Sequence, residues 1–169
     1  MPVKPSDRIL CHIVALVLLL MLLTHCSSYH VNLMGASYHF NRQYYGRSYD
    51  EFNPGVGAGG VNTFGNSNFG FTATYLKNSF NNDAFYLAGH FTYTYMRLGK
   101  FSNASGLLAG VATGYERRYT NTREQNPIPI AGLMNDICYA DFCAFQVVMP
   151  SYDNMSGFIA GGLRYNFRL

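Results

Sequence analysis

The sequence predicts an all-β fold, and within that class an eight-stranded antiparallel transmembrane β-barrel of the outer-membrane type. Apolar residues alternate with small or polar ones along many short segments. The connections between these segments alternate along the sequence between short and long. One strand of a soluble β-sandwich could show the same alternation, but here it recurs along the chain. It is clearest in 69–77, where one face would carry Phe69, Phe71, Ala73 and Tyr75 and the other Gly70, Thr72 and Thr74.

The chain begins with the three-part layout of a secretory signal peptide. Met1–Arg8 is basic, Leu10–Leu23 is almost wholly apolar, and small residues follow. The apolar run is short for a membrane-spanning helix, which needs roughly 20 residues, so an uncleaved anchor is the weaker alternative. We expect a signal peptide over 1–28 and a barrel domain over 29–169. Cys26 leaves a lipoprotein open, although His25 stands where such a signal has a small residue.

The composition favours a protein whose outer surface faces lipid. Hydrophobic residues make up 49% of the chain and charged residues 12%, yet beyond the leader no apolar stretch is long enough to cross a bilayer as a helix. The net charge of +3, without a basic run, gives no support to a nucleic-acid-binding surface. We expect a monomer in the bacterial outer membrane, with no nucleic-acid partner and no cofactor.

The expected strands follow the leader at the spacing typical of an all-β fold. An even number of strands is what a bacterial outer-membrane barrel requires, and closure leaves no unpaired sheet edge in the hydrocarbon. Short periplasmic turns would be 65–68, 99–105 and 139–141, and longer outer loops 41–53, 78–84, 116–126 and 150–156. The expected strands are 31–40, 54–63, 69–77, 85–96, 105–115, 128–137, 142–149 and 157–168.

The last strand indicates which face is inside the barrel. Arg164 and Arg168 share a face opposite a row of apolar residues. An arginine on the lipid face at mid-depth costs roughly 2–4 kcal/mol, so both arginines should point inward or lie near the rim. The same parity turns many small residues inward, which either leaves room for a ligand or merely permits sheet curvature. These residues are Gly55, Gly57, Gly59, Ala88, Gly110 and Gly114.

Two cysteines near the carboxyl end could close a turn. Cys138 and Cys143 bracket four residues, and no histidine or further cysteine lies nearby. In an exported chain a disulfide is favoured over a metal site, and we expect no metal.

Three residues at the outer rim could carry chemistry. His39 lies at the outer end of the first expected strand, and Asn78 and Ser79 lie at the outer end of the third. An imidazole near a hydroxyl is the minimal pair for acyl transfer. The plainer alternatives are an interfacial histidine and a turn serine.

Five short motifs between 37 and 150 occur in a recognisable order. They resemble motifs of the outer-membrane lipid A palmitoyltransferases (PagP), namely Thr-Trp-His, Tyr-Asn-Glu-Arg-Pro-Trp-Gly, Phe-Lys-Asp-Ser-Trp-Asn, a proline-rich strand start and Phe-Gln-Met-Thr-Tyr-Ile-Pro. The matching segments are Ser37–His39, Tyr49–Gly55, Leu76–Asn81, Ile128–Ile130 and Phe145–Pro150.

The resemblance implies an eight-stranded barrel that moves a palmitoyl chain from the sn-1 position of a phospholipid to lipid A, so that its partners are the phospholipid and lipopolysaccharide of the outer membrane. It implies that His39 is the base and Ser79 its hydroxyl partner, and that Pro150 lies at a weakened strand edge through which lipid enters. His90, inward and deeper than His39, falls close to the family's glycine at the floor of the acyl slot. We therefore expect His90 to help set the depth of that slot.

Two departures from the family bear on this assignment. Asn78 replaces the family's Asp, so no carboxylate supports an imidazolium, and Asp at position 78 would be expected to raise activity. The amphipathic helix before the family's first strand is missing. Two hypotheses follow, a lipid A acyltransferase and a catalytically silent barrel that binds lipid or acts structurally.

Overall fold

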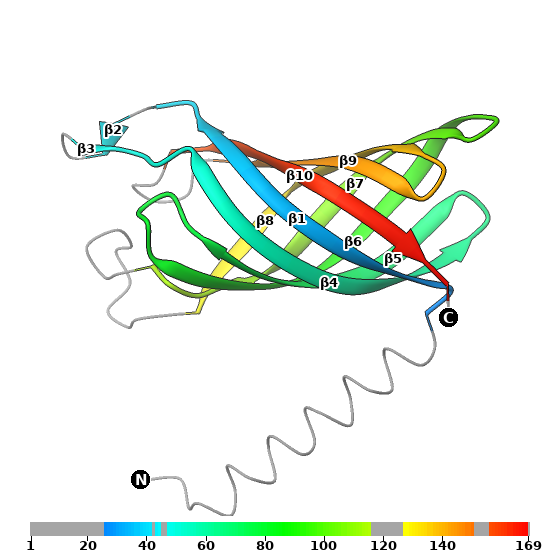
Figure 1. Cartoon of the computed structure of the whole chain (residues 1–169), viewed down its shortest axis with the longest axis horizontal. Coiled ribbons are helices and arrows are strands. Elements are labelled where there is room, and N and C mark those ends of the chain that lie inside the picture. Colours follow the sequence, from blue (N-terminus) through cyan, green and yellow to red (C-terminus); the bar gives the residue numbers. More distant parts are fainter. Residues whose placement is uncertain (1–25, 42, 45–46, 116–126, 151–155, 169) are drawn as a thin grey trace, which may run out of the picture.

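The computed structural model describes residues 26–41, 43–44, 47–115, 127–150 and 156–168, and it shows a closed antiparallel barrel (Figure 1). No helix among the described residues is long and apolar enough to cross a membrane. The barrel strands are β1 (Ser28–His39), β4 (Phe52–Phe64), β5 (Ser67–Lys77), β6 (Asp83–Leu98), β7 (Phe101–Ala112), β8 (Ile128–Tyr139), β9 (Phe142–Met149) and β10 (Phe158–Phe167).

The strand order confirms the predicted fold class. Strands that follow one another in the barrel sequence pair side by side, and β1 closes the sheet by pairing with both β4 and β10. Two further strands, β2 (Gln43–Tyr44) and β3 (Arg47–Ser48), form a small separate sheet within the connection between β1 and β4. The sequence did not predict this small sheet.

The two ends of the barrel differ as the separator lengths predicted. Tight turns join β4 to β5, β6 to β7 and β8 to β9 at the end where the chain terminates, and the longer connections gather at the other end (Figure 1). We call these the turn end and the loop end. β1 begins at Ser28, so the first strand starts at the last residue of the expected leader. Just before it, the Ser27 backbone N–H donates a 3.0 Å hydrogen bond to Asn62 Oδ1 on β4.

One of the predicted turns is shorter in the structure than the sequence indicated. The segment 99–105 is not a loop, because β7 begins at Phe101 and only a two-residue turn at Gly99-Lys100 separates it from β6. Gly99 has a φ of +60°, a conformation that glycine adopts without steric cost. Ser102 and Ala104 line the interior near the turn end, so small and polar residues that resembled a loop belong to an inward strand face.

The outer surface is apolar around the barrel. Leu33, Leu107, Leu133 and Leu163 come from different strands, and each is more than half exposed. A continuous apolar surface of this kind is unfavourable in water and suits hydrocarbon. Exposed aromatic side chains lie towards the strand ends, where Tyr and Phe suit a membrane interface. At the turn end they are Phe64, Phe69, Tyr93, Tyr95, Tyr139, Phe142 and Tyr165.

The interior changes character along the barrel axis. An apolar cluster of Ala88, Leu108, Met134, Phe145, Val147 and Met149 occupies the part nearer the loops. Arg164 lies inside as predicted, with 5% of its surface exposed, and Arg168 is exposed at the turn end. The inward position of Arg164 follows from the high free-energy cost of placing its charge in lipid.

Candidate functional site

His39 is the last residue of β1 and points into the barrel at the loop end. Its imidazole stacks on the Tyr49 ring, with centroids 3.9 Å apart and planes 7° from parallel. The Phe158 ring lies 5.3 Å away on the neighbouring β10. The side chain is 3% exposed, and among the described residues Nδ1 has no hydrogen-bond partner. Packing between two rings, rather than a hydrogen bond to Nδ1, therefore fixes the orientation of this imidazole.

The segment Tyr49-Asp50 connects His39 with Ser79. Tyr49 stacks on His39, and the next backbone N–H, that of Asp50, donates a 2.9 Å hydrogen bond to the Ser79 carbonyl oxygen. His39 and Ser79 line one cavity of about 210 Å³ at the loop-end rim, which we call the rim cavity. The structure thus brings the two predicted residues to the same cavity.

Asn78 has a role in the loop between β5 and β6. Its side chain is 1% exposed, Nδ2 donates a 2.9 Å hydrogen bond to the Gly114 carbonyl oxygen, and Oδ1 accepts 3.0 Å hydrogen bonds from the backbone N–H groups of Phe80 and Asn82. None of its hydrogen bonds goes to His39. Asn78 therefore satisfies buried backbone groups, which need a partner away from water, and ties the β5–β6 loop to the end of β7.

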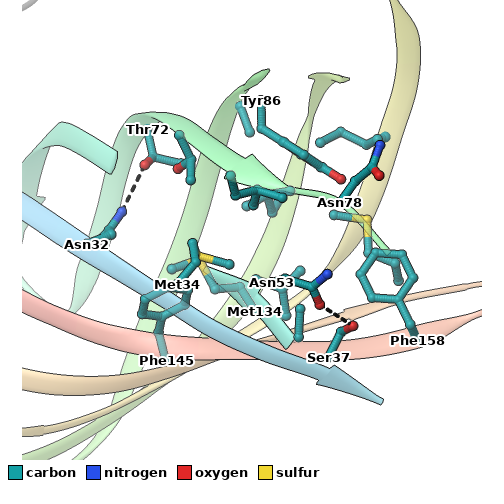
Figure 2. A pocket seen from close by; sticks show the side chains of 18 of the residues that line it. Asn32, Met34, Ser37, Asn53, Thr72, Asn78, Tyr86, Met134, Phe145 and Phe158 are labelled. Carbon is teal, nitrogen blue, oxygen red and sulfur yellow. Dashed lines mark hydrogen bonds between the residues drawn. The ribbon is translucent and has the colours of Figure 1, made fainter. Parts of the chain in front are cut away.

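A narrow apolar cavity leads down from the rim, and we call it the slot. It shares Ser79, Tyr86, Tyr115, Ile130, Met149 and Phe158 with the rim cavity, so the two cavities adjoin. Met34, Met134 and Phe145 line it deeper in the barrel (Figure 2). The slot and the rim cavity have volumes of about 90 and 210 Å³, and the apolar lining of the slot suits a hydrocarbon chain.

A polar layer closes the deep end of the slot. Arg164 Nε donates a 2.9 Å hydrogen bond to Asn32 Oδ1, and Arg164 Nη1 forms a 3.0 Å ion pair with Asp136 Oδ2. Asn32 Nδ2 in turn donates a 3.0 Å hydrogen bond to Thr72 Oγ1 (Figure 2). The Arg164 guanidinium also lies 5.1 Å from the centre of the Phe145 ring. These groups meet the slot at Arg164, Asn32 and Thr72 and form its floor.

His90 lies on the other side of this floor from the slot. It lines a polar cavity of about 620 Å³ at the turn end and does not line the slot. Its imidazole lies 6.1 Å from that of His30. A side chain at Gly70 would collide with the His90 ring, so Gly70 makes the room that this ring occupies. The sequence-based expectation that His90 bounds the slot is therefore corrected, because Arg164 and its partners intervene.

The inward glycines do not leave the space for a ligand that their number suggested. A side chain at Gly59 would meet the His30 ring, and one at Gly57 would meet Thr74. At Gly110 the backbone of β6 lies too close for a side chain. These glycines mostly allow large side chains or a neighbouring strand to approach. The slot owes its space instead to small inward residues such as Ala88 and Ala160.

Pro150 follows β9 at a place where the barrel wall is incompletely paired. The pairing of β8 with β9 reaches only Leu133 and Val148, although β8 begins at Ile128. Pro129 and Ala131 are exposed on the outside of β8, yet they line the rim cavity together with Pro150. Proline has no backbone N–H to pair across a gap of this kind. The rim cavity therefore reaches the lipid-facing surface between β8 and β9.

Cys138 and Cys143 form a disulfide across the tight turn between β8 and β9, as their spacing predicted. The two residues are also direct partners in the strand pairing. Within the described part of the chain, no group of three or more His, Cys, Asp and Glu residues could hold a metal ion.

Sequence analysis missed Tyr49 and Arg164 as parts of the site. Tyr49 belongs to a motif that was noticed as a whole, and its position next to His39 depends on how the first loop folds back. The alternation of residues along the last strand correctly predicted that Arg164 points into the barrel. Its depth relative to the slot depends on how the strands are tilted, and the alternation pattern carries no information about tilt.

Comparison with known proteins shows the fold. No protein-family model and no curated protein matches the chain. A de novo designed transmembrane β-barrel is similar, with 12% identity, a TM-score of 0.54, and coverage of 84% of this chain and 97% of that one. Neisserial surface protein A shares 13% identity, with a TM-score of 0.48 and coverage of 83% and 96%. The Yersinia pestis outer membrane protein Ail shares 14% identity, with a TM-score of 0.44 and coverage of 83% and 99%.

Closed barrels with an even number of antiparallel strands and an apolar outer belt are an outer-membrane architecture. The chain is accordingly a bacterial outer-membrane barrel.

Proposed function

We propose that the protein is an acyltransferase that moves a palmitoyl chain from a phospholipid to lipid A, with His39 and Ser79 at the reacting centre. One observation carries the proposal: the rim cavity is lined by both residues, reaches the lipid-facing surface, and adjoins an apolar slot. A reaction between two membrane lipids needs lateral access, a place for the chain and a group that activates a hydroxyl. The resemblance of five motifs to the lipid A palmitoyltransferases supports the same assignment.

In the proposed reaction, the Ser79 hydroxyl attacks the sn-1 ester carbonyl while His39 takes the hydroxyl proton. The bond from the carbonyl carbon to the glycerol oxygen breaks, and His39 passes its proton to that oxygen. The acyl chain is then an ester of Ser79, and a lysophospholipid leaves. A lipid A hydroxyl attacks this ester, His39 takes its proton, and the proton returns to Ser79. The atoms and protons in these two steps balance without a cofactor.

The slot offers the chain an apolar place to bind. Its walls of Met34, Met134 and Phe145 replace the hydrocarbon that the chain leaves in the bilayer, so the chain can enter without exposure to water. The floor of Arg164, Asn32 and Thr72 presents charge and hydroxyl groups that a methyl end does not displace favourably. Chain length would then be selected by the distance from the rim pair to this floor.

Asn78 favours a second candidate function, a barrel that binds lipid or detergent-like molecules, or acts structurally, without acyl transfer. The described structure places no carboxylate in hydrogen-bond contact with His39, and Nδ1 has no partner there. In triads of this type, a carboxylate holds the tautomer and stabilises the imidazolium. A binding barrel would use the same slot and lateral opening.

Mass spectrometry of lipid A from expressing cells tests the proposal. The protein should add the mass of one palmitoyl chain, and His39→Ala and Ser79→Ala should each abolish the gain while keeping the heat-modifiable migration of a folded barrel. Ser156→Ala is the matched control, because Ser156 lines the same rim cavity but lies outside the proposed pair. If the folded protein adds no chain yet retains a labelled fatty acid in detergent, the binding function replaces the enzymatic one.

A further inference from the structure

Three residues with hydroxyl groups meet where the slot adjoins the rim cavity. Of the six described residues that line both cavities, three carry a hydroxyl group and three are apolar. Those with a hydroxyl group are Ser79, Tyr86 and Tyr115. An acyl chain that lies in the slot with its ester at Ser79 would have its carbonyl group at this junction. The two tyrosines therefore line the part of the cavity where the reacting bond would lie.

Tyr86 and Tyr115 are joined by a hydrogen bond between their hydroxyl groups. Tyr115 is 8% exposed, and the partly buried Tyr86 packs in the same apolar cluster. Figure 2 shows the Tyr86 side chain pointing towards Asn78, the residue before Ser79. The Asn78 side chain in turn donates a 2.9 Å hydrogen bond to the carbonyl oxygen of Gly114, next to Tyr115. The tyrosine pair is thus fixed against the loop that carries Ser79.

The backbone around Ser79 offers few donors for a reacting carbonyl oxygen. The N–H groups of Phe80 and Asn82 donate to Asn78 Oδ1. Those of Asn78 and Asn81 donate to the carbonyl oxygens of Asn82 and Asn78. Acyl transfer places negative charge on the substrate carbonyl oxygen, and donors aimed at that oxygen supply a large part of catalysis. These residues therefore leave at most the N–H of Ser79 itself, and a second donor has to come from outside the loop.

The tyrosine pair can present such a donor. Each phenol has one O–H group, and the hydrogen bond between the two tyrosines uses one of them. When Tyr115 donates to the Tyr86 oxygen, the Tyr86 O–H can donate to a carbonyl oxygen in the cavity. The hydrogen bond from Tyr115 also polarises the Tyr86 hydroxyl, which makes Tyr86 a stronger donor in apolar surroundings.

We propose that Tyr86 is a further catalytic residue, whose hydroxyl donates a hydrogen bond to the ester carbonyl oxygen while Ser79 attacks the carbonyl carbon. The inference rests on the proposed acyl transfer. As the bond from Ser79 forms, an electron pair of the C=O bond moves to the oxygen, and Tyr86 stabilises this charge without giving up its proton. The C=O bond forms again when the glycerol oxygen leaves with the proton from His39. Tyr115 is a positioning residue, because it acts through Tyr86.

The rate of palmitoyl transfer to lipid A by the purified barrel tests the inference. Tyr86→Phe should lower kcat about 10²-fold and leave KM nearly unchanged, because the ring in the slot wall remains and only the donor is lost. Tyr115→Phe should lower kcat less. Tyr75→Phe is the matched control and should keep the native rate, since the Tyr75 hydroxyl donates a 2.7 Å hydrogen bond to Asp83 on the outer face.

Tyr86→Phe leaves the Tyr115 hydroxyl without its partner, which can impair folding. Tyr86→Phe combined with Tyr115→Phe removes both hydroxyl groups and keeps the test valid, with heat-modifiable migration as the folding assay. This double variant should lose no more activity than Tyr86→Phe alone, because the two hydroxyl groups act as a unit. Transfer at the native rate by either folded variant overturns the inference and leaves the proposed function standing.

Infrared spectroscopy separates this inference from the proposed function. Ser79→Ala protein, which cannot start the reaction, is loaded with a phospholipid that is isotope-labelled at its sn-1 carbonyl. The stretching frequency of that carbonyl should be lower than in Ser79→Ala combined with Tyr86→Phe, because a hydrogen bond weakens the C=O bond. Equal frequencies overturn the inference. If the native protein transfers no chain, the proposed function and the catalytic role of Tyr86 both fall, and the frequency then decides whether Tyr86 binds the carbonyl.

Discussion

The His39 imidazole lies flat on the Tyr49 ring, with centroids 3.9 Å apart and planes 7° from parallel. The two residues flank most of the first outer connection, and this stack brings them together at the rim. Phe80 continues the aromatic contact, with its ring 5.5 Å from that of Tyr49. The position of the proposed base thus depends on its aromatic neighbours.

Tyr49→Ala should lower acyl transfer strongly, whereas Tyr49→Phe should retain most of it. The phenylalanine ring keeps the stack and loses the hydroxyl, which accepts a weak 3.4 Å hydrogen bond from the Ser156 N–H. Misplacing a reacting group by about 1 Å can cost about 10²-fold in rate. The measurement is the rate of palmitoylated lipid A formation, and equal rates for both variants would show that Tyr49 does not position His39.

Asn78→Asp should lower stability and should not raise activity, contrary to the expectation from sequence. Aspartate keeps the acceptor for Phe80 and Asn82 but loses the donor to the Gly114 carbonyl oxygen, and it sets a negative charge beside that oxygen. A buried acceptor left without its donor costs about 1–3 kcal/mol. Urea unfolding in detergent measures the loss, with the exposed neighbour Asn81→Asp as the control for added charge. Higher activity in Asn78→Asp would contradict this prediction and would support the sequence-based expectation that Asn at position 78 lowers activity relative to Asp.

Ala88→Leu should shorten the acyl chain that the protein transfers. Ala88 is buried in the slot wall, so the added atoms would occupy space that a chain needs. Ala109→Leu adds the same atoms on the exposed face of β7 and should change nothing. The chain-length distribution of modified lipid A gives the result.

His90→Gly should leave this chain-length distribution unchanged, because His90 lines the polar cavity below the floor. The sequence alone predicted a longer chain. A shift of the distribution to longer chains in His90→Gly would show that the floor gives way when the ring beneath it is removed.

Reducing the disulfide should weaken the barrel modestly. Cys138 and Cys143 close a short loop between strands already paired at that point, so the loss should be about 2 kcal/mol. Unfolding curves with and without reductant measure it, and Cys26→Ser should leave the difference unchanged. Alkylation of Cys138 and Cys143 in protein isolated without reductant would contradict the bridge.

The sequence by itself determined the faces of the strands and the two ends of the barrel. Alternation placed Phe69 and Tyr75 outside and Thr72 and Thr74 inside, and the cost of an arginine in lipid placed Arg164 inside. These properties are local, since a side-chain period of two depends only on neighbouring residues. The pairing of cysteines five apart across a turn is local in the same sense.

Only the tertiary structure decided which inward residues share a depth. The resemblance to the palmitoyltransferases predicted that His90 borders the slot, but Arg164, Asn32 and Thr72 lie between them. The same holds at the rim, where the first outer connection folds back to bring Tyr49 to His39 and Asp50 to Ser79. The alternation of residues along a strand shows which face of the strand each side chain is on. The depth of that side chain in the barrel depends on how far each strand is shifted against its neighbour when the sheet closes.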